Sequence, residues 1–226
     1  MKLKQLLLGL VLVTLPVVVM AHGQDEWIVK IGVAHVAPDA SSGPITSKAD
    51  GSIVIPGSPV DVDSGTALGI TIGRMLNENI GLELLAATPF AHDLEGDEAL
   101  AGLGKIGEIE HLPPSLLVQY HFSPDAKVQP YVGAGANYTF FFNEESSSSL
   151  DAALGAPTDI SLDDSFGLAA QAGVDVMMDN GWFFNAALWW LDIETTAEIQ
   201  PAGAGALEVD VDVDPLVYMI GFGKTF

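Results

Sequence analysis

The stretch PLVYMIGFGKTF, residues 215–226, alternates large side chains with small ones. Its even-numbered positions are Leu216, Tyr218, Ile220, Phe222, Lys224 and Phe226, and its odd-numbered positions include Gly221, Gly223 and Thr225. Successive side chains of a β-strand point to opposite faces, so this alternation predicts a strand with one apolar face. Chain ends are usually polar and loosely held, whereas this end has the composition of a strand.

Similar long segments recur along the chain, rich in Val, Ile, Ala, Gly and aromatic residues and followed by turn residues. Together with the last one they are residues 25–37, 64–76, 80–91, 109–122, 128–142, 165–178, 182–197 and 209–226. Strands of this length exceed the roughly five or six residues usual in globular proteins. They fit a tilted crossing of a bilayer, which takes roughly 9–11 residues per strand.

The connections between these segments alternate in length. The long ones are residues 38–63, 92–108, 143–164 and 198–208, and the short ones are residues 77–79, 123–127 and 179–181. Long outer loops and tight periplasmic turns are typical of outer-membrane barrels. The sequence therefore predicts an all-β protein, an eight-stranded antiparallel transmembrane β-barrel over residues 22–226, with the long connections extracellular and both termini periplasmic.

The beginning of the chain predicts export. Lys2 and Lys4 precede an apolar run that ends in the small residue Ala21, which is the pattern of a cleavable signal peptide over residues 1–21. A membrane anchor is the less favoured alternative, because the run is short and contains Pro16. The formal net charge of −22 argues against nucleic acid as a partner, since phosphates require Lys and Arg. Without cysteine the chain forms no disulfide.

Several stretches resemble the OmpW family of small outer-membrane proteins. They are NIGLELLAATPFAHDL (79–94), HLPPSLLVQYHF (111–122), QPYVGAGANYTFFF (129–142), the GVDVMM…W segment (173–182), LDIETTA (191–197) and VDPLVYMIGFGKTF (213–226). The resemblance implies an eight-stranded barrel in the cell outer membrane, with a narrow apolar interior that passes small hydrophobic molecules. A closing strand ending in Phe226 resembles the signal that the barrel-assembly machinery recognises. Lys224 departs from the aromatic residue expected in that signal and could reach the lipid headgroups.

The alternation also predicts which side chains face the lumen. The predicted lumen or ligand-path residues are Glu83, Leu85, Ala87, Leu117, Gln119, Trp189 and Met219. An eight-stranded barrel is just wide enough for its own side chains, so a wide aqueous pore is not expected. We predict a channel for passive passage of small hydrophobic molecules, with Leu85 and Trp189 at the constriction. The alternative is a lumen that is only a packed core.

Other polar residues carry less specific signals. Glu83 would need a partner inside the barrel, and Arg74 is one possibility. His92 and His111 lie at the outer ends of neighbouring strands, but two histidines are too few to predict a metal site. Catalytic motifs are absent from the sequence, so we predict neither an enzyme nor a cofactor.

The outer loops support a rival function. Acidic residues gather there, at Glu144, Glu145, Asp151, Asp159, Asp163 and Asp164, and at Glu208, Asp210, Asp212 and Asp214, where they alternate with valines like an extension of the strand. The rival is a non-transporting surface barrel whose acidic loops bind cations, lipopolysaccharide or a partner. Ser149 could cap a short helix in one loop. For the channel, exit through the floor and lateral exit near Pro113, Pro114 and Pro130 both remain open.

Overall fold

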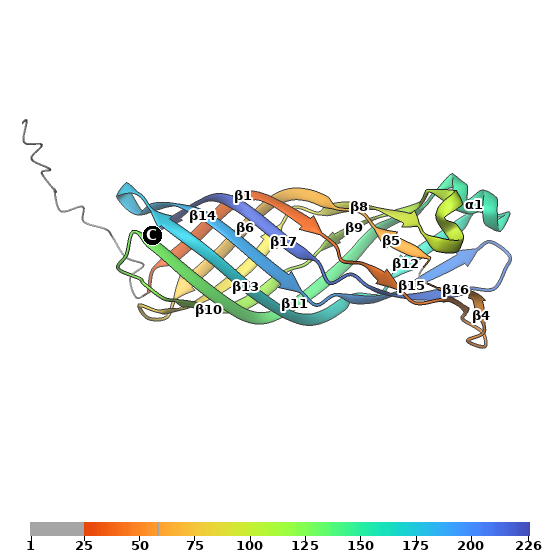
Figure 1. Ribbon diagram of the computed structural model, residues 1–226, viewed down its shortest axis with the longest axis horizontal. Helices are drawn as coiled ribbons and strands as arrows, with labels where there is room; N and C mark the ends of the chain where they lie inside the picture. The colour runs from red at the N-terminus through yellow and green to blue at the C-terminus, as the bar shows by residue number, and fades with distance from the viewer. Residues whose placement is uncertain (1–24, 58) are drawn as a thin grey trace, which may run out of the picture.

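The computed structural model describes residues 25–57 and 59–226, so the predicted signal peptide lies outside the described residues. Eight strands form a closed antiparallel barrel (Figure 1). They are β1 (Trp27–Ala37), β6 (Gly65–Met75), β7 (Ile80–Ala87), β10 (Ser115–His121), β11 (Val128–Ser146), β13 (Ser165–Met177), β14 (Trp182–Leu191) and β17 (Leu216–Thr225). Because β1 pairs with both β6 and β17, and β10 pairs with both β7 and β11, the barrel has no free edge.

The closing pair, β1 and β17, explains the composition of residues 215–226. Backbone hydrogen bonds join Trp27 and Phe226 in both directions, so pairing runs to the last residue. Gly32 lies opposite Gly221, and a Cβ atom on either would overlap the backbone of the other strand. The ammonium group of Lys224 lies 5.4 Å from the Trp182 ring centroid and 5.0 Å from that of Phe226. The predicted strand is therefore confirmed.

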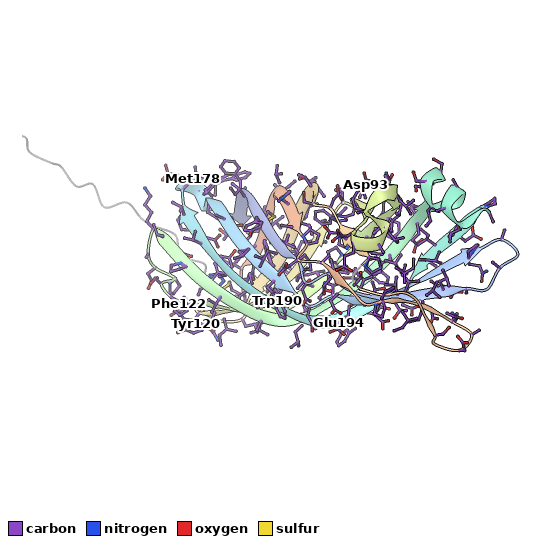
Figure 2. The ribbon with its side chains drawn as sticks, turned by 45° about the vertical axis from the view of Figure 1, so that its right-hand side comes forward. Asp93, Tyr120, Phe122, Met178, Trp190 and Glu194 are labelled. Atoms are coloured by element: carbon purple, nitrogen blue, oxygen red, sulfur yellow. The ribbon has the colours of Figure 1, made fainter. Side chains whose placement is uncertain are left out.

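Side-chain burial follows the predicted alternation. On β17, Val217 and Met219 are buried while Tyr218 and Ile220 are exposed. The outward side chains of the barrel are large and apolar, as Tyr120, Phe122, Met178 and Trp190 show in Figure 2. A bilayer requires a closed barrel, because lipid offers the backbone no hydrogen bonds. It also requires an apolar outer surface where the strands contact lipid.

The barrel continues outward as further strands, several of which lie wholly or partly in stretches that the sequence predicted as loops. These strands are β2 (Ser41–Ser42), β3 (Ile45–Ser47), β4 (Ile53–Ile55), β5 (Val60–Val62), β8 (Phe90–Gly96), β9 (Lys105–Leu112), β12 (Thr158–Leu162), β15 (Glu194–Pro201) and β16 (Leu207–Asp212). They form the right-hand end of Figure 1. Their alternation keeps apolar residues inside and polar ones outside: on β16, Val209 and Val211 are buried, while Asp210 is exposed. The change from outward Trp190 to outward Glu194 marks the outer edge of the apolar band (Figure 2).

Short helices complete the connections. They are η1 (Glu98–Leu103), α1 (Ser148–Leu154) and η2 (Asp179–Gly181), the last in a tight turn at the end of the barrel where Asp25 and Phe226 lie. The helix α1 is capped by Ser147, whose Oγ accepts a hydrogen bond from the Leu150 amide, so the predicted cap at Ser149 was wrong. None of the helices in residues 25–57 and 59–226 is long and apolar enough to cross a membrane.

Candidate functional site

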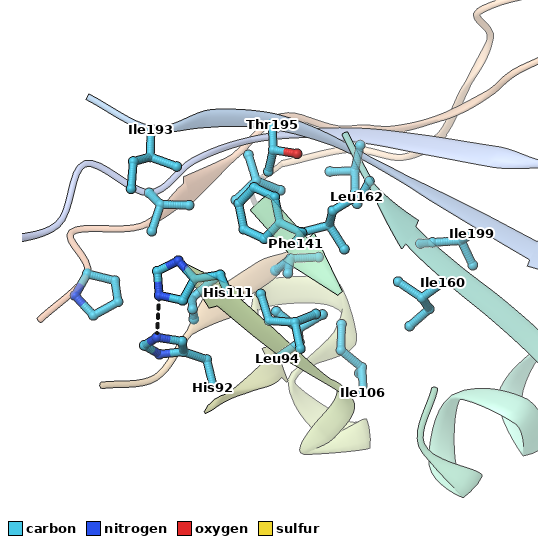
Figure 3. A pocket seen from close by; sticks show the side chains of 18 of the residues that line it. His92, Leu94, Ile106, His111, Phe141, Ile160, Leu162, Ile193, Thr195 and Ile199 are labelled. Atoms are coloured by element: carbon cyan, nitrogen blue, oxygen red, sulfur yellow. Dashed lines mark hydrogen bonds between the residues drawn. The ribbon is translucent and has the colours of Figure 1, made fainter. Parts of the chain in front are cut away.

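The outer extension encloses an apolar cavity, which we call the outer cup (Figure 3). Its lining includes Val36, Val62, Leu94, Ile106, Ile109, Phe141, Ile160, Leu162, Ile193, Ile199, Val209, Val211 and Val213. About 710 Å³ of the cup is free of protein atoms, part of it open to solvent. Ligand sites are typically concave and mostly apolar with a few placed polar groups. The sequence signal for the cup was the two-residue alternation, which continues from the outer ends of the predicted strands into stretches predicted as loops.

A second apolar hollow lies next to the cup, between the helices α1 and η1 and the strands β3, β4, β15 and β16. It is lined by Ile45, Ile55, Leu100, Leu103, Ala153, Leu154 and Leu207, and it shares Ile106, Leu150 and Ile199 with the cup. Because three side chains border both spaces, the hollow and the cup lie side by side. The tip of the protein is therefore apolar inside, while its outer surface is acidic.

The structure places the predicted lumen residues inside the barrel at two levels. Leu85, Leu117, Trp189 and Met219 are buried and belong to the same apolar cluster as the cup. Ala87 is half-buried and packs against this cluster. Glu83 and Gln119 are also buried, but they belong to a polar group on the side of the short turns. The barrel interior is thus apolar toward the cup and polar toward the floor.

A network of buried polar side chains fills the barrel on that side, and we call it the floor network. Its members are Lys30, Thr71, Glu83, Gln119, Tyr131, Gln171, Asp175 and Asn185. The ammonium group of Lys30 donates to Glu83 at 2.8 Å and to the Tyr131 hydroxyl at 3.2 Å. Gln171 donates to the second carboxylate oxygen of Glu83 at 2.8 Å. Buried charges are tolerated when paired and hydrogen-bonded in this way.

The floor network corrects one expectation from the sequence. Arg74 is exposed and donates to Asp25 at 3.1 Å, so it is not the partner of Glu83. Lys30 provides the partner instead, and the sequence analysis missed it. Below the network, Ile28, Met75, Met177 and Phe183 form a second apolar cluster across the barrel. Two successive layers of packed side chains therefore close the floor.

The wall is interrupted between the β7–β8 and β9–β10 segments. The β7–β10 ladder ends at the pair Leu85 and Ser115, and the β8–β9 ladder starts at Phe90 and His111. Within the described chain, no backbone hydrogen bond joins residues 86–89 to residues 112–114. We call this interruption the seam. Two prolines, Pro113 and Pro114, lie in it and have no amide hydrogen to donate.

A small hollow lies at the seam. It is lined by Ala34, Leu85, Ala86, Ala87, Phe90, Pro113 and Val217. Leu85 and Val217 belong to the lumen, whereas Ala86 is exposed on the outside of the wall. The seam therefore brings lumen and lipid-facing side chains to one hollow. Pro130 differs from Pro113, because it lies in a paired part of β11 opposite Val174 and accepts from the Phe122 amide.

Two histidines give the cup its main polar feature. His92 on β8 and His111 on β9 are buried, and their Nε2 atoms lie 3.0 Å apart (Figure 3). Nδ1 of His92 lies 2.7 Å from the carbonyl oxygen of Asp63. His111 stacks on Phe141, with ring centroids 5.9 Å apart. The pair is held rigidly in the outer extension, beyond the apolar band.

Both histidines resist protonation. Burial lowers the pKa of His111 to about 3, and the neighbouring His92 adds to this effect. Burial also lowers the pKa of His92 from 6.5, although the Asp63 carbonyl and carboxylate oppose it, and His35 adds to the lowering. Both rings are therefore neutral near neutral pH.

Acid is expected to destabilise the protein through this pair. Below a pH of about 6.5 the unfolded chain binds protons that the folded pair excludes, so the free energy of unfolding falls as pH falls toward about 3. The slope is at most about 1.4 kcal/mol per pH unit for each histidine. Urea unfolding of wild type and of the double variant His92→Phe/His111→Phe at a series of pH values measures it. A difference between the two proteins that does not change with pH would contradict the assignment.

Comparisons with known proteins agree with this architecture. The sequence model of the OmpW family matches residues 23–226. The chain is 44% identical to outer membrane protein W of Vibrio cholerae over 212 residues, covering 92% of each chain. The crystal structure of OprG from Pseudomonas aeruginosa superposes with a TM-score of 0.84 at 42% identity, covering 92% of this chain and 99% of that one. The dibenzothiophene metabolism operon protein PahQ of Pseudomonas aeruginosa is 26% identical over 205 residues, covering 90% of each.

Proposed function

The chain belongs to the OmpW family of outer-membrane proteins, and from this premise we propose that it passes small hydrophobic molecules across the outer leaflet. Such molecules enter the outer cup from outside, reach the lumen around Leu85 and Trp189, and leave sideways through the seam into the membrane. The observation that carries the proposal is the combination of an apolar cup with a floor closed by buried charges.

The outer cup supports uptake of apolar rather than polar molecules. A hydrophobic molecule outside the cell reaches the protein from water, at a membrane surface covered by lipopolysaccharide. An apolar cavity stabilises the molecule by removing its surface from water. The lining offers aliphatic side chains from several strands and few polar groups. The name of the relative PahQ refers to the metabolism of dibenzothiophene. Dibenzothiophene is a mostly apolar molecule, which agrees with this class of substrate.

The floor network supports a lateral exit. A hydrophobic molecule that continued straight down would have to separate Lys30 from Glu83, whose charges would then lie buried and unpaired. It would also meet the cluster around Phe183. The seam would avoid both layers, because it lies at the level of Leu85 and its hollow is lined both by lumen residues and by the outward-facing Ala86.

Closing the seam tests the proposal. The chain has no cysteine, so a pair introduced by Ala87→Cys and Pro113→Cys can be bridged selectively with a short dithiol cross-linker. Passage of a fluorescent apolar probe into proteoliposomes is expected to fall severalfold on bridging and to recover on reduction. The matched control is Ala134→Cys with Ala170→Cys, an exposed pair in register across the intact β11–β13 ladder, whose bridging should leave passage unchanged.

The results separate the possible routes. Passage that survives bridging of the seam would exclude lateral exit and leave the floor as the route. Passage equal to that of empty liposomes for the unbridged protein would exclude transport altogether. Ion conductance, measured alongside, should stay low in both cross-linked forms because the floor network is unchanged.

One observation favours the rival function, a non-transporting surface barrel. In the outer extension Glu194 lies directly opposite Asp212, and Glu198 lies opposite Glu208. Like charges opposite one another are destabilising, and Lys48 contacts Glu198 and Glu208 but neither member of the other pair. A divalent cation or a lipopolysaccharide-bound cation would relieve this repulsion. If calcium raises the thermal stability of the protein and passage is absent, the rival is the better description.

A further inference from the structure

Two polar atoms on the proposed path have no hydrogen-bond partner among the described residues. One is Nδ1 of His111 in the outer cup, and the other is Nε1 of Trp189 in the lumen. Both side chains are at least nine-tenths buried among apolar residues. Polar groups in such surroundings normally have a partner, so two unpaired ones along a path suggest that its occupant provides it.

The hydrogen bonds around His92 determine what His111 can offer. Nδ1 of His92 faces the carbonyl oxygen of Asp63 at 2.7 Å, and a carbonyl only accepts, so this nitrogen carries the proton. In the neutral ring, Nε2 of His92 is then an acceptor. The contact of 3.0 Å between the two Nε2 atoms therefore requires His111 to donate from Nε2. This leaves Nδ1 of His111 without a proton, as an acceptor on the side toward Ile193 (Figure 3).

Trp189 offers the opposite property. Its indole Nε1 only donates, and its ring is fully buried in the lumen below the cup. Along β14 and the residues that follow, Trp189, Leu191 and Ile193 point inward in succession, and Ile193 lines the cup beside His111. A molecule moving from the cup toward the seam would thus meet an acceptor first and a donor later.

We propose that the path takes apolar molecules that carry one hydroxyl group, such as a hydroxylated aromatic hydrocarbon. The hydroxyl donates to Nδ1 of His111 in the cup, and its oxygen accepts from Nε1 of Trp189 in the lumen. A hydroxyl group is both donor and acceptor, so it satisfies each atom in turn. This inference rests on the proposed function and narrows its substrate class.

Three probes of similar shape test the inference in the full-length protein in nanodiscs. Naphthalene has no polar group, 1-methoxynaphthalene only accepts, and 1-naphthol both donates and accepts. Each probe also partitions into lipid. Its partitioning is therefore measured in empty nanodiscs, and the dissociation constant is expressed relative to the probe concentration in the lipid. Wild type is expected to bind 1-naphthol about threefold to tenfold more tightly than naphthalene, which is the effect of one net hydrogen bond.

Three variants assign the preference to atoms. His111→Phe should reduce the binding of 1-naphthol to that of 1-methoxynaphthalene and leave naphthalene unchanged. Trp189→Phe removes the N–H and should weaken both oxygen-bearing probes relative to naphthalene. The control is Trp190→Phe, which removes an indole N–H from the exposed outer face of the same strand and should leave the ratios unchanged.

A second readout needs no variant of the site. In ¹⁵N-labelled wild type, the Nδ1 resonance of His111 should shift with 1-naphthol only, and the Trp189 indole resonance with both oxygen-bearing probes. Binding of all three probes in proportion to their apolarity, with unchanged resonances, would overturn the inference while supporting the apolar path. Absence of binding by every probe would instead count against the proposed function.

Discussion

Replacing Lys30 with methionine is expected to lower the free energy of unfolding by about 3–5 kcal/mol, the usual loss when one partner of a buried ion pair is removed. Methionine keeps the length of the side chain but removes the charge that lies 2.8 Å from Glu83. Glu83 would then remain buried with only the hydroxyl of Thr71 and the amide of Gln171 as partners. Urea unfolding in lipid vesicles measures the change.

Two further variants show whether the ion pair is the cause. Arg74→Met removes a charge from an exposed pair with Asp25, so it should cost no more than about 1 kcal/mol. The double variant Lys30→Met/Glu83→Leu leaves neither partner of the pair unsatisfied and should recover most of the loss. If Lys30→Met costs no more than Arg74→Met, the floor is not held by this pair.

Replacing Leu85 with tryptophan is expected to reduce passage of an apolar probe to the rate of empty liposomes. Leu85 is buried at the level of the seam and lines its hollow, so a larger side chain is expected to fill the hollow through which the proposed path leaves the lumen. Overpacking of this kind typically costs about 1–3 kcal/mol, which leaves the barrel folded. Probe flux into proteoliposomes, with folding checked in parallel, measures the effect.

The neighbouring residue provides the matched control. Leu84 is exposed on the lipid-facing side of the same strand, so Leu84→Trp makes the same chemical change outside the barrel and should leave flux unchanged. Trp189→Ala removes the largest buried side chain of the lumen and should raise flux without raising ion conductance, because the floor network lies below it. Equal flux for Leu85→Trp and Leu84→Trp would contradict a path past Leu85.

The barrel itself was predictable because its signals are local and repeated. A two-residue alternation assigns each side chain to lipid or lumen, and the alternating lengths of the connections fix which ends of the strands lie together. The strand residues 215–226 and the family were therefore identified correctly. The same alternation continues through β15 and β16, where the outward residues are charged. The sequence analysis placed residues 194–197 and 209–212 in strands and residues 198–208 in a loop.

The contents of the lumen depended on tertiary structure. Alternation tells which residues of a strand face inward. It does not tell which inward side chains from different strands lie at the same height along the barrel axis and contact one another. Lys30 lies opposite Thr71 on β6, and Glu83 lies opposite Gly73 on the same strand, so the ion pair crosses an intervening strand. Arg74 was close to Glu83 in sequence but faces outward.

The sequence by itself determined the closed barrel and the facing of its strands, because these follow from a period of two residues along each strand. Only the tertiary structure decided the partner of Glu83, the contact between His92 and His111, and the position of the seam. Each of these requires the stagger between strands to place side chains from different strands at the same level. The seam shows this most clearly. Residues 86–89 and 112–114 are each unpaired with the other, and the wall is interrupted because the two stretches lie opposite one another.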